Sequence, residues 1–311
     1  MTERPLRVVA PKLGDPRVTL ALALTTWTIF GQTFLFFNRD PVQIGIAVGV
    51  GCGLDMLLAL VFHRQILVPI SAYITTLSIG ILLASNDWRV FAVAATWGVT
   101  SKYFLRAGDR HFFNPSNFAI VASLQLMHGA ATVAAGSQWG GDYRVTALIM
   151  VLGLLMMRRV GRFDLVLAWL GGYTMMGLLR VALGQGGLIF ALGPMTGAEF
   201  MLFTFSMLPD PKTNPPTSNA RIVWGLLIAI LDGVLRYLEV RYSMFYALFA
   251  FCAALPLFRL VAKVRGIEEA DPWRTVTLVL GGARMATAPA TVRATGTASA
   301  EIGPSNRYRS H

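Results

Sequence analysis

Charged residues are scarce in this sequence. They make up 14% of its 311 residues, whereas 55% are hydrophobic and the mean hydropathy is +0.57. Soluble domains carry about 25% charged residues. A chain this apolar has too little polar surface to be covered by water, so we predict an all-α integral membrane protein. The net charge of +11 does not indicate nucleic acid, because no basic run is interleaved with aromatic residues.

Cysteine is also scarce, and the usual catalytic motifs are missing. Cys52 and Cys252 both fall in apolar stretches, where they are expected to be small buried hydrophobes. No Cys or His cluster has the spacing of zinc or iron–sulfur ligands, so we predict no metal site. No Ser/His/Asp arrangement, Walker motif or dinucleotide fingerprint is found either. These absences argue against a hydrolase or a nucleotidase.

Long apolar stretches are what the sequence has in abundance. Ten of them approach the roughly 20 residues that a helix needs to cross a bilayer. They cover 18–37, 42–62, 66–85, 89–105, 115–135, 145–160, 163–183, 188–208, 221–240 and 243–262. Gly193-Pro194 interrupts the eighth stretch and predicts a broken helix, which is tolerated only against protein or a wet cavity. The break is either a simple kink or a half-helix N-terminus that receives an anion.

Lys and Arg are distributed unevenly between the predicted loops. If all ten stretches cross, sixteen Lys and Arg before residue 266 lie on the side of the termini and six on the other. This bias predicts that both termini are cytoplasmic, in a multi-pass protein of a bacterial inner membrane. We therefore divide the chain into an N-terminal segment (1–17), a transmembrane domain (18–265) and a tail (266–311). The tail is rich in Ala, Thr, Ser and Gly, which predicts disorder.

Three carboxylates fall inside the predicted spans. Asp55, Glu199 and Asp232 are candidate functional residues, because a carboxylate in the hydrocarbon costs about 3 kcal/mol unless it is paired or hydrated. Arg236 lies one turn from Asp232 on the same helix face, so we favour a structural pair there. The sequence places no cation near Asp55. Its functional and structural interpretations therefore stay open.

Small residues form one face of the second span. Gly45, Gly49 and Gly53 follow one another at intervals of four. Such spacing is typical of helices whose backbones approach closely. We predict tight packing within this chain, with a partner-subunit interface as the alternative.

Two polar segments interrupt the apolar chain. The first contains Arg106, Arg110, His111 and then Asn114-Pro115-Ser116-Asn117, and the second is Asp210-Pro211-Lys212-Thr213-Asn214. Asn114 precedes proline, which predicts an extended residue that caps the following helix. The predicted topology places both segments in the cytoplasm. Together they form either a cationic, amide-rich pocket or a clasp that joins two loops and binds nothing.

These segments carry a family resemblance. The residues are Lys102-Tyr103-Phe104-Leu105-Arg106, then His111-Phe112-Phe113-Asn114-Pro115-Ser116-Asn117-Phe118-Ala119, and Phe205-Ser206-Met207-Leu208-Pro209-Asp210-Pro211-Lys212-Thr213. In them the chain resembles the RnfD/NqrB family of membrane electron-transport subunits, nearest to its short UnbU-like branch from enediyne gene clusters. The resemblance implies two inverted five-helix repeats. It also implies electron transfer together with other membrane or redox subunits.

The resemblance further implies a flavin, FMN or riboflavin, with quinone as another redox partner. Asn114, Ser116, Asn117, Asp210, Lys212 and Thr213 are then the expected pocket residues. Redox members of the family attach FMN to a Thr in a Ser-Gly-Ala-Thr-like motif, which this sequence lacks. Only Thr196 has a loosely similar placement on the outer side. We therefore do not expect covalent FMN, which leaves a non-covalent flavin, a quinone or no cofactor.

Two other functions suit the same features. A broken span and buried carboxylates are typical of a transporter or exporter with its site at the bilayer midplane. A glycine face on the second span suits a non-catalytic structural subunit of a larger membrane complex. Electron transfer, in which the protein orients a cofactor and tunes its surroundings, is the first hypothesis.

Overall fold

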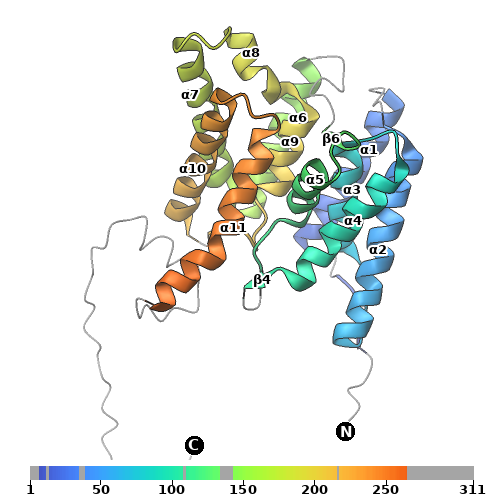
Figure 1. The fold of residues 1–311 in the computed structure, drawn as a ribbon. Coiled ribbons are helices and arrows are strands. Elements are labelled where there is room, and N and C mark those ends of the chain that lie inside the picture. The colour runs from blue at the N-terminus through green and yellow to red at the C-terminus, as the bar shows by residue number, and fades with distance from the viewer. Residues whose placement is uncertain are drawn as a thin grey trace, which may run out of the picture.

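The computed structural model describes residues 7–11, 14–34, 39–107, 110–133, 143–215 and 217–264. Most of this part of the chain is helical (Figure 1). The N-terminal strand β1 and the end of the last helix lie at the same end of the bundle, at the bottom of Figure 1. The predicted disorder of residues 266–311 concerns residues outside those described.

A helix, or a broken pair of helices, occupies each of the ten predicted apolar stretches. The first group is α1 (Pro16–Phe34), α2 (Pro41–His63), α3 (Ile70–Leu82), α4 (Trp88–Phe104) and α5 (Pro115–Leu126). The second is α6 (Tyr143–Val160), α7 (Phe163–Ala182), α8 (Leu188–Leu192), η1 (Gly193–Thr196), α9 (Ala198–Leu202), η2 (Phe203–Met207), α10 (Ser218–Tyr237) and α11 (Ser243–Val264).

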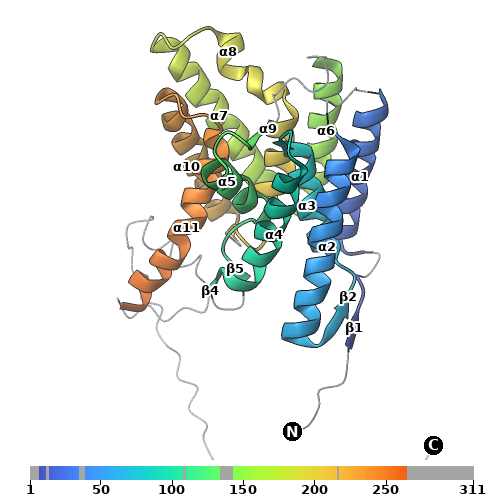
Figure 2. The same ribbon diagram turned by 45° about the vertical axis from the view of Figure 1, so that its right-hand side comes forward.

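Three short strand pairs tie loops together at the ends of the bundle. They are β1 (Arg7–Val9) with β2 (Gln65–Leu67), β3 (Leu83–Ala84) with β6 (Thr132–Val133), and β4 (Arg106–Ala107) with β5 (Arg110–His111). The first pair is parallel and the other two are antiparallel. In Figure 2, β1, β2, β4 and β5 all lie at one end. Residues 7–9 of the N-terminal segment are therefore part of the fold.

Local sequence explains where several helices begin. Asp40 and Asp87 have extended backbones, and their carboxylates accept hydrogen bonds from the backbone N–H groups two residues on. Pro41 then occupies the first position of α2, where a missing N–H costs nothing. Asn114 caps α5 in the same way, and this confirms the prediction made for it.

The two groups of helices repeat one packing pattern. In the first group α2 packs on both α3 and α4, and α4 packs on α5; in the second, α7 packs on α8 and α10, and α10 packs on α11. The groups meet through their last helices, α5 and α11, which lie side by side in the middle of the molecule (Figures 1 and 2). A smaller contact joins α3 to α9.

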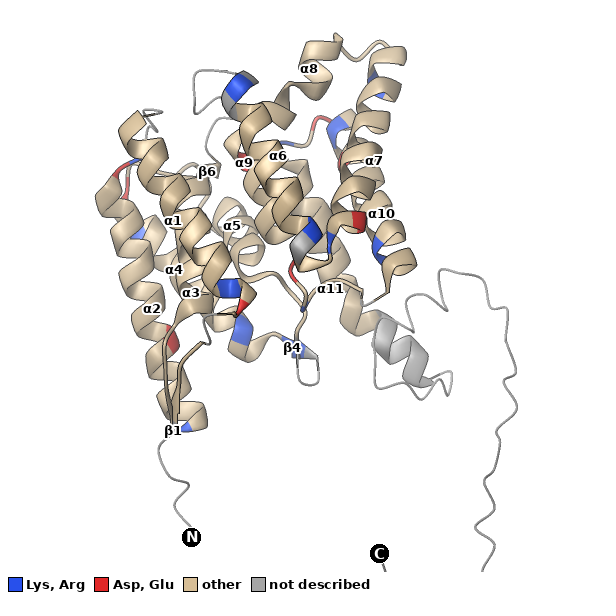
Figure 3. Ribbon diagram, turned by 180° about the vertical axis from the view of Figure 1, so that it is seen from behind, with Lys and Arg blue, Asp and Glu red and all other residues tan. Residues whose placement is uncertain are grey.

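Within the part of the chain that the structure describes, three helices are long and apolar enough to cross a membrane: α2, α7 and α10. The run from Leu188 to Met207 makes a fourth if its two parts, bent by 60° at Gly197, form one broken span. Charged residues lie mostly toward the ends of the helices, and the middle of the bundle is largely uncharged (Figure 3). Large apolar side chains are exposed on the outside, including Leu57 (55%), Leu178 (50%) and Val223 (47%). Such a surface suits lipid better than water.

The predicted spans at 66–85 and 115–135 are longer than the helices found there. α3 has 13 residues and α5 has 12, which corresponds to roughly 20 Å against about 30 Å of hydrocarbon. Both stop where β3 and β6 pair with each other. After α5 the chain also turns through Gly129, whose φ of 78° ends helical geometry. The break predicted at Gly193-Pro194 is confirmed.

The glycine face of α2 does not pack within the described chain, contrary to our prediction. A methyl group at Gly45, Gly49 or Gly53 would meet nothing within 4 Å. The close approach is made instead by Gly51, whose Cα faces Thr76 on α3 and Val99 on α4. The stripe therefore faces outward, and the packing face lies on the other side of the helix.

Glycine also sets the contact between α7 and α10, and this gives a matched pair of variants. A Cβ at Gly225 would lie 2.8 Å from the carbonyl oxygen of Leu165, so backbone would have to move. We expect Gly225→Ala to destabilise the fold by about 1–3 kcal/mol, despite a helix-propensity gain of up to about 1 kcal/mol. Thermal unfolding in detergent measures this. Gly49→Ala is the control and should unfold no earlier than the wild type; equal melting of both variants would contradict the packing.

Candidate functional site

Asn114 joins the two polar segments directly. Its side-chain oxygen accepts the backbone N–H of Asn117 (3.0 Å), which caps α5. Its side-chain nitrogen donates to the carbonyl of Met207 and to Oδ2 of Asp210, both at 3.3 Å. One buried amide therefore begins a helix of the first group and holds the loop of the second. We call these bonds of Asn114, together with the bond of Asn117 described in the next paragraph, the clasp.

Asn117 and Ser116 extend the attachment. The amide of Asn117, which is fully buried, donates to the carbonyl of Phe245 on α11 (3.1 Å). The hydroxyl of Ser116 donates to the carbonyl of Thr75 on α3 (3.3 Å). Each side chain thus bonds a backbone oxygen of a different helix. Asn117 holds the two groups together, and Ser116 fixes α5 within its own group.

The second polar segment is a tight turn built around Asp210. Oδ1 of Asp210 accepts the backbone N–H of Lys212 (3.0 Å), and its carbonyl accepts the hydroxyl of Thr213 (3.3 Å). Asn214 donates to the carbonyl of Leu208 (3.4 Å). Asp side chains favour such turns because they satisfy the backbone two residues on. The turn leaves Oδ2 of Asp210 for Asn114 and projects Lys212 away from the backbone.

A cavity of about 320 Å³ lies against the clasp. We call it the clasp cavity. Asn114, Ser116, Asp210 and Lys212 line one part of it, and apolar side chains such as Leu20, Ile74, Met156, Met157 and Phe205 line the rest. Two polar atoms of its lining residues, Ser78 Oγ and Arg162 Nε, are buried and find no hydrogen-bond partner among the described residues. The sequence left a clasp and a pocket as alternative interpretations. The structure contains both a clasp and a cavity beside it.

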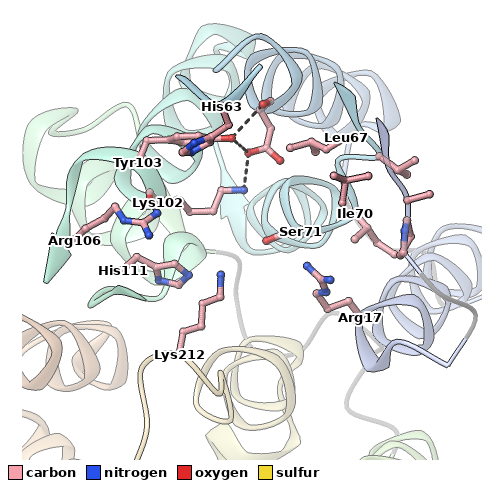
Figure 4. Close-up of a pocket in the computed structure, with 15 residues that line it drawn as sticks. Arg17, His63, Leu67, Ile70, Ser71, Lys102, Tyr103, Arg106, His111 and Lys212 are labelled. Carbon is pink, nitrogen blue, oxygen red and sulfur yellow. Dashed lines mark hydrogen bonds and ion pairs between the residues drawn. The ribbon is translucent and has the colours of Figure 1, made fainter. Parts of the chain in front are cut away.

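A second cavity of about 250 Å³ lies under strand β1 and is strongly basic. Arg17, Lys102, Arg106 and Lys212 line it, together with His63 and His111, and among the described lining residues Asp55 supplies the one carboxylate. Figure 4 shows Arg17, Lys102 and Lys212 pointing toward one space from three different parts of the chain. We call it the basic cavity. It shares Arg17, Ser71, His111 and Lys212 with the clasp cavity, so the two cavities adjoin each other.

Asp55 has a cation beside it, which the sequence did not reveal. Lys102 on α4 places Nζ 3.0 Å from Oδ1 of Asp55, and both side chains are buried. The hydroxyl of Tyr103 donates to the same oxygen (3.0 Å). Residues 55 and 102 are far apart in the sequence but face each other across the contact of α2 with α4. The structure therefore places a buried ion pair at the wall of the basic cavity (Figure 4).

His111 is buried where the two cavities adjoin. Its Nδ1 lies 2.8 Å from the carbonyl of Phe113, which favours an N–H at that position. Burial lowers the pKa of His111 below its usual value; Lys212 and Lys102 lower it further, and Asp210 opposes them. An uncharged imidazole leaves Nε2 as an acceptor. The fixed positive charge of the basic cavity therefore comes from Lys and Arg.

The remaining predicted residues do not join these cavities. Thr196 is exposed in η1 and donates its hydroxyl to the carbonyl of Gly193 (2.7 Å). Asp232 pairs with Arg236 (2.8 Å), as the sequence predicted, and also accepts a hydrogen bond from the hydroxyl of Ser243. Glu199 is half-buried at the start of α9. Thr196, Asp232 and Glu199 line neither cavity.

Three more predicted residues occupy intermediate positions. Thr213 and Asn117 are buried in the clasp without lining a cavity. Arg110 lies in β5, where its backbone pairs with Ala107. The prediction missed Arg17, Ser71 and Arg162, which line the cavities. The sequence could have pointed to Arg17 and Arg162, because they are cations at predicted cytoplasmic ends of spans. Nothing in the sequence singles out Ser71.

The Asp55–Lys102 pair gives a test of this geometry. Lys102→Met leaves a buried carboxylate unpaired and should destabilise the protein by about 3–5 kcal/mol. Adding Asp55→Asn should recover part of that loss, because the uncompensated charge is then gone. Thermal unfolding of the two single variants and the double variant in detergent measures the coupling. If the losses simply add, the two side chains do not interact.

No family model matches this chain, and neither does any curated protein. The clasp, the two cavities and the side chains that line them are the features that bear on function.

Proposed function

We propose that the chain is an RnfD/NqrB-like membrane subunit that takes part in electron transfer and holds a non-covalent flavin in the clasp cavity. The supporting observation is the clasp itself, because it brings the two segments that carry the resemblance together beside a cavity of ligand size. Ligand sites typically measure about 300–1,000 Å³ and combine apolar walls with a few polar groups. The clasp cavity, which adjoins the basic cavity, meets that description.

The residues of the clasp cavity fit a flat heterocycle with carbonyl and ring-nitrogen atoms. Phe205, Met156 and Met157 offer aromatic and thioether surface. Ser78, Arg162 and Lys212 add a hydroxyl and two cations to the lining. A bound flavin would supply the redox chemistry. The protein would fix the ring, exclude water through its apolar wall and place positive charge near one edge.

Thr196 does not fit a role in attachment. It lines neither cavity, and its hydroxyl is already bonded within η1. This agrees with the missing Ser-Gly-Ala-Thr-like motif and favours a ligand held by contacts alone. A quinone is the alternative occupant of the same apolar wall.

The finer topology belongs to the same proposal. We place ten crossings in two inverted five-helix repeats, with both termini in the cytoplasm of a bacterial inner membrane. The repeated packing of α2 with α4 and α7 with α10 supports this, as does the meeting of α5 with α11 at the centre. The N-terminal end of α1 and the C-terminal end of α11 also lie at the same end of the bundle (Figure 1). In that topology both cavities open toward the cytoplasm, where soluble or membrane redox partners would deliver electrons.

A flavin spectrum tests the proposal. The protein purified in mild detergent should show flavin absorbance, or gain it on incubation with FMN or riboflavin followed by desalting. Ser71→Trp fills the junction of the two cavities and should abolish retention. Leu155→Trp, at an exposed apolar position of α6, is the matched control and should retain flavin as the wild type does.

The proposal fails in its flavin form if the well-folded wild type neither carries nor takes up flavin. Retention of flavin by Ser71→Trp equal to that of the wild type would instead move the site away from these cavities.

A further inference from the structure

Strand β1 supplies part of the wall of the basic cavity. Val9 and the two residues after it, Ala10 and Pro11, line that cavity. The parallel pairing of β1 with β2 holds them there, and the backbone N–H of Val68 donates a further hydrogen bond to the carbonyl of Val9 (3.1 Å). Figure 4 shows Leu67, the last residue of β2, beside the cavity. An N-terminal strand thus closes one side of a space whose other walls come from later parts of the chain.

The attachment of β1 is slight. It consists of three paired residues; the side chains of Val8 and Val9 are 70% and 40% exposed, and Ile66, the partner of Val8, is 42% exposed. Parallel pairing is less stable per residue than antiparallel pairing, and a lone two-stranded sheet is only marginally stable in water. Little apolar surface is buried to oppose separation of the two strands. β1 therefore belongs to the least stable part of the fold, where local opening occurs without global unfolding.

The elements around the cavity do not depend on β1. Asp15 caps α1, because its carboxylate accepts the backbone N–H of Arg17 (2.9 Å) and its carbonyl accepts that of Val18 (2.9 Å). The helices α2, α3 and α4, which line the cavity, pack on one another. The buried Asp55–Lys102 pair joins two of these helices. β1 can therefore leave β2 while the helices and the ion pair stay in place.

The basic cavity leads from β1 to the clasp cavity. Arg17, Ser71, His111 and Lys212 line both cavities. We propose that β1 is a displaceable strap: when it is paired with β2 it closes the basic cavity, and when it leaves β2 it opens a route past Ser71 and Lys212 to the clasp cavity. Such a strap controls access alone, whichever ligand the clasp cavity takes.

Cysteine labelling measures the opening. Ile70 lines the basic cavity but not the clasp cavity, so Ile70→Cys reports access from the side of β1. Its reaction with a water-soluble maleimide in detergent, followed by peptide mass spectrometry, should become about tenfold faster when Val9→Pro is added, because proline cannot donate to the strand pairing. Val8→Thr changes an exposed side chain of the same strand and should leave the rate unchanged. Asn219→Cys, at an exposed position of α10, should react equally in every strand variant.

A crosslink tests the same motion in the opposite direction. Val8 and Ile66 are register partners on neighbouring strands, which lie about 4.8 Å apart, within reach of a disulfide. With Val8→Cys and Ile66→Cys added, Ile70→Cys should label at least about tenfold more slowly in the oxidised protein than in the reduced protein, because labelling follows the population of the open form.

Unchanged labelling in Val9→Pro, or equal labelling of the oxidised and reduced crosslink variant, would overturn the strap. A large loss of thermal stability in Val9→Pro would also contradict it, since a weakly attached strand contributes little to global unfolding. Neither labelling measurement involves a flavin, so its result is independent of the flavin spectrum.

Discussion

The bonds of two buried asparagines hold the halves of this protein in one arrangement. Asn114 caps α5 with its oxygen and holds Met207 and Asp210 with its nitrogen, and Asn117 bonds the backbone of α11. Apolar packing between helices is weakly directional in a bilayer, because lipid tails are as apolar as the side chains. Buried amides are directional and costly to leave unpaired. They therefore set the register of α5 against α11 and the position of the loop that carries Lys212.

Both cavities depend on that position. The turn around Asp210 closes one side of the clasp cavity and projects Lys212 into its junction with the basic cavity. The buried Asp55–Lys102 pair stiffens the opposite wall, where α2 meets α4. Strand β1 covers the basic cavity from outside, with Val9 among the residues that line it. The ion pair, the turn and the strand together enclose a space lined by cations at one end of an apolar bundle.

The sequence predicted the parts of this arrangement that depend on local chemistry. Hydropathy located all ten helical stretches, Asn-Pro located the start of α5, and Gly193-Pro194 located the break. What depends on contacts between distant segments was not predictable. The outward direction of the Gly45–Gly53 face is one example. The pairing of Asp55 with Lys102 is another, since helix azimuth and interhelical register are set by packing.

The central claim is that Asn114 and Asp210 hold the two segments together, and a double-mutant cycle tests it most directly. Asn114→Ala, Asp210→Ala and the double variant would be compared with the wild type by thermal unfolding in the same detergent. The structure predicts a coupling free energy of about 1 kcal/mol between the two side chains, because they share a buried hydrogen bond with a charged acceptor. Additive losses, with a coupling near zero, would contradict the clasp.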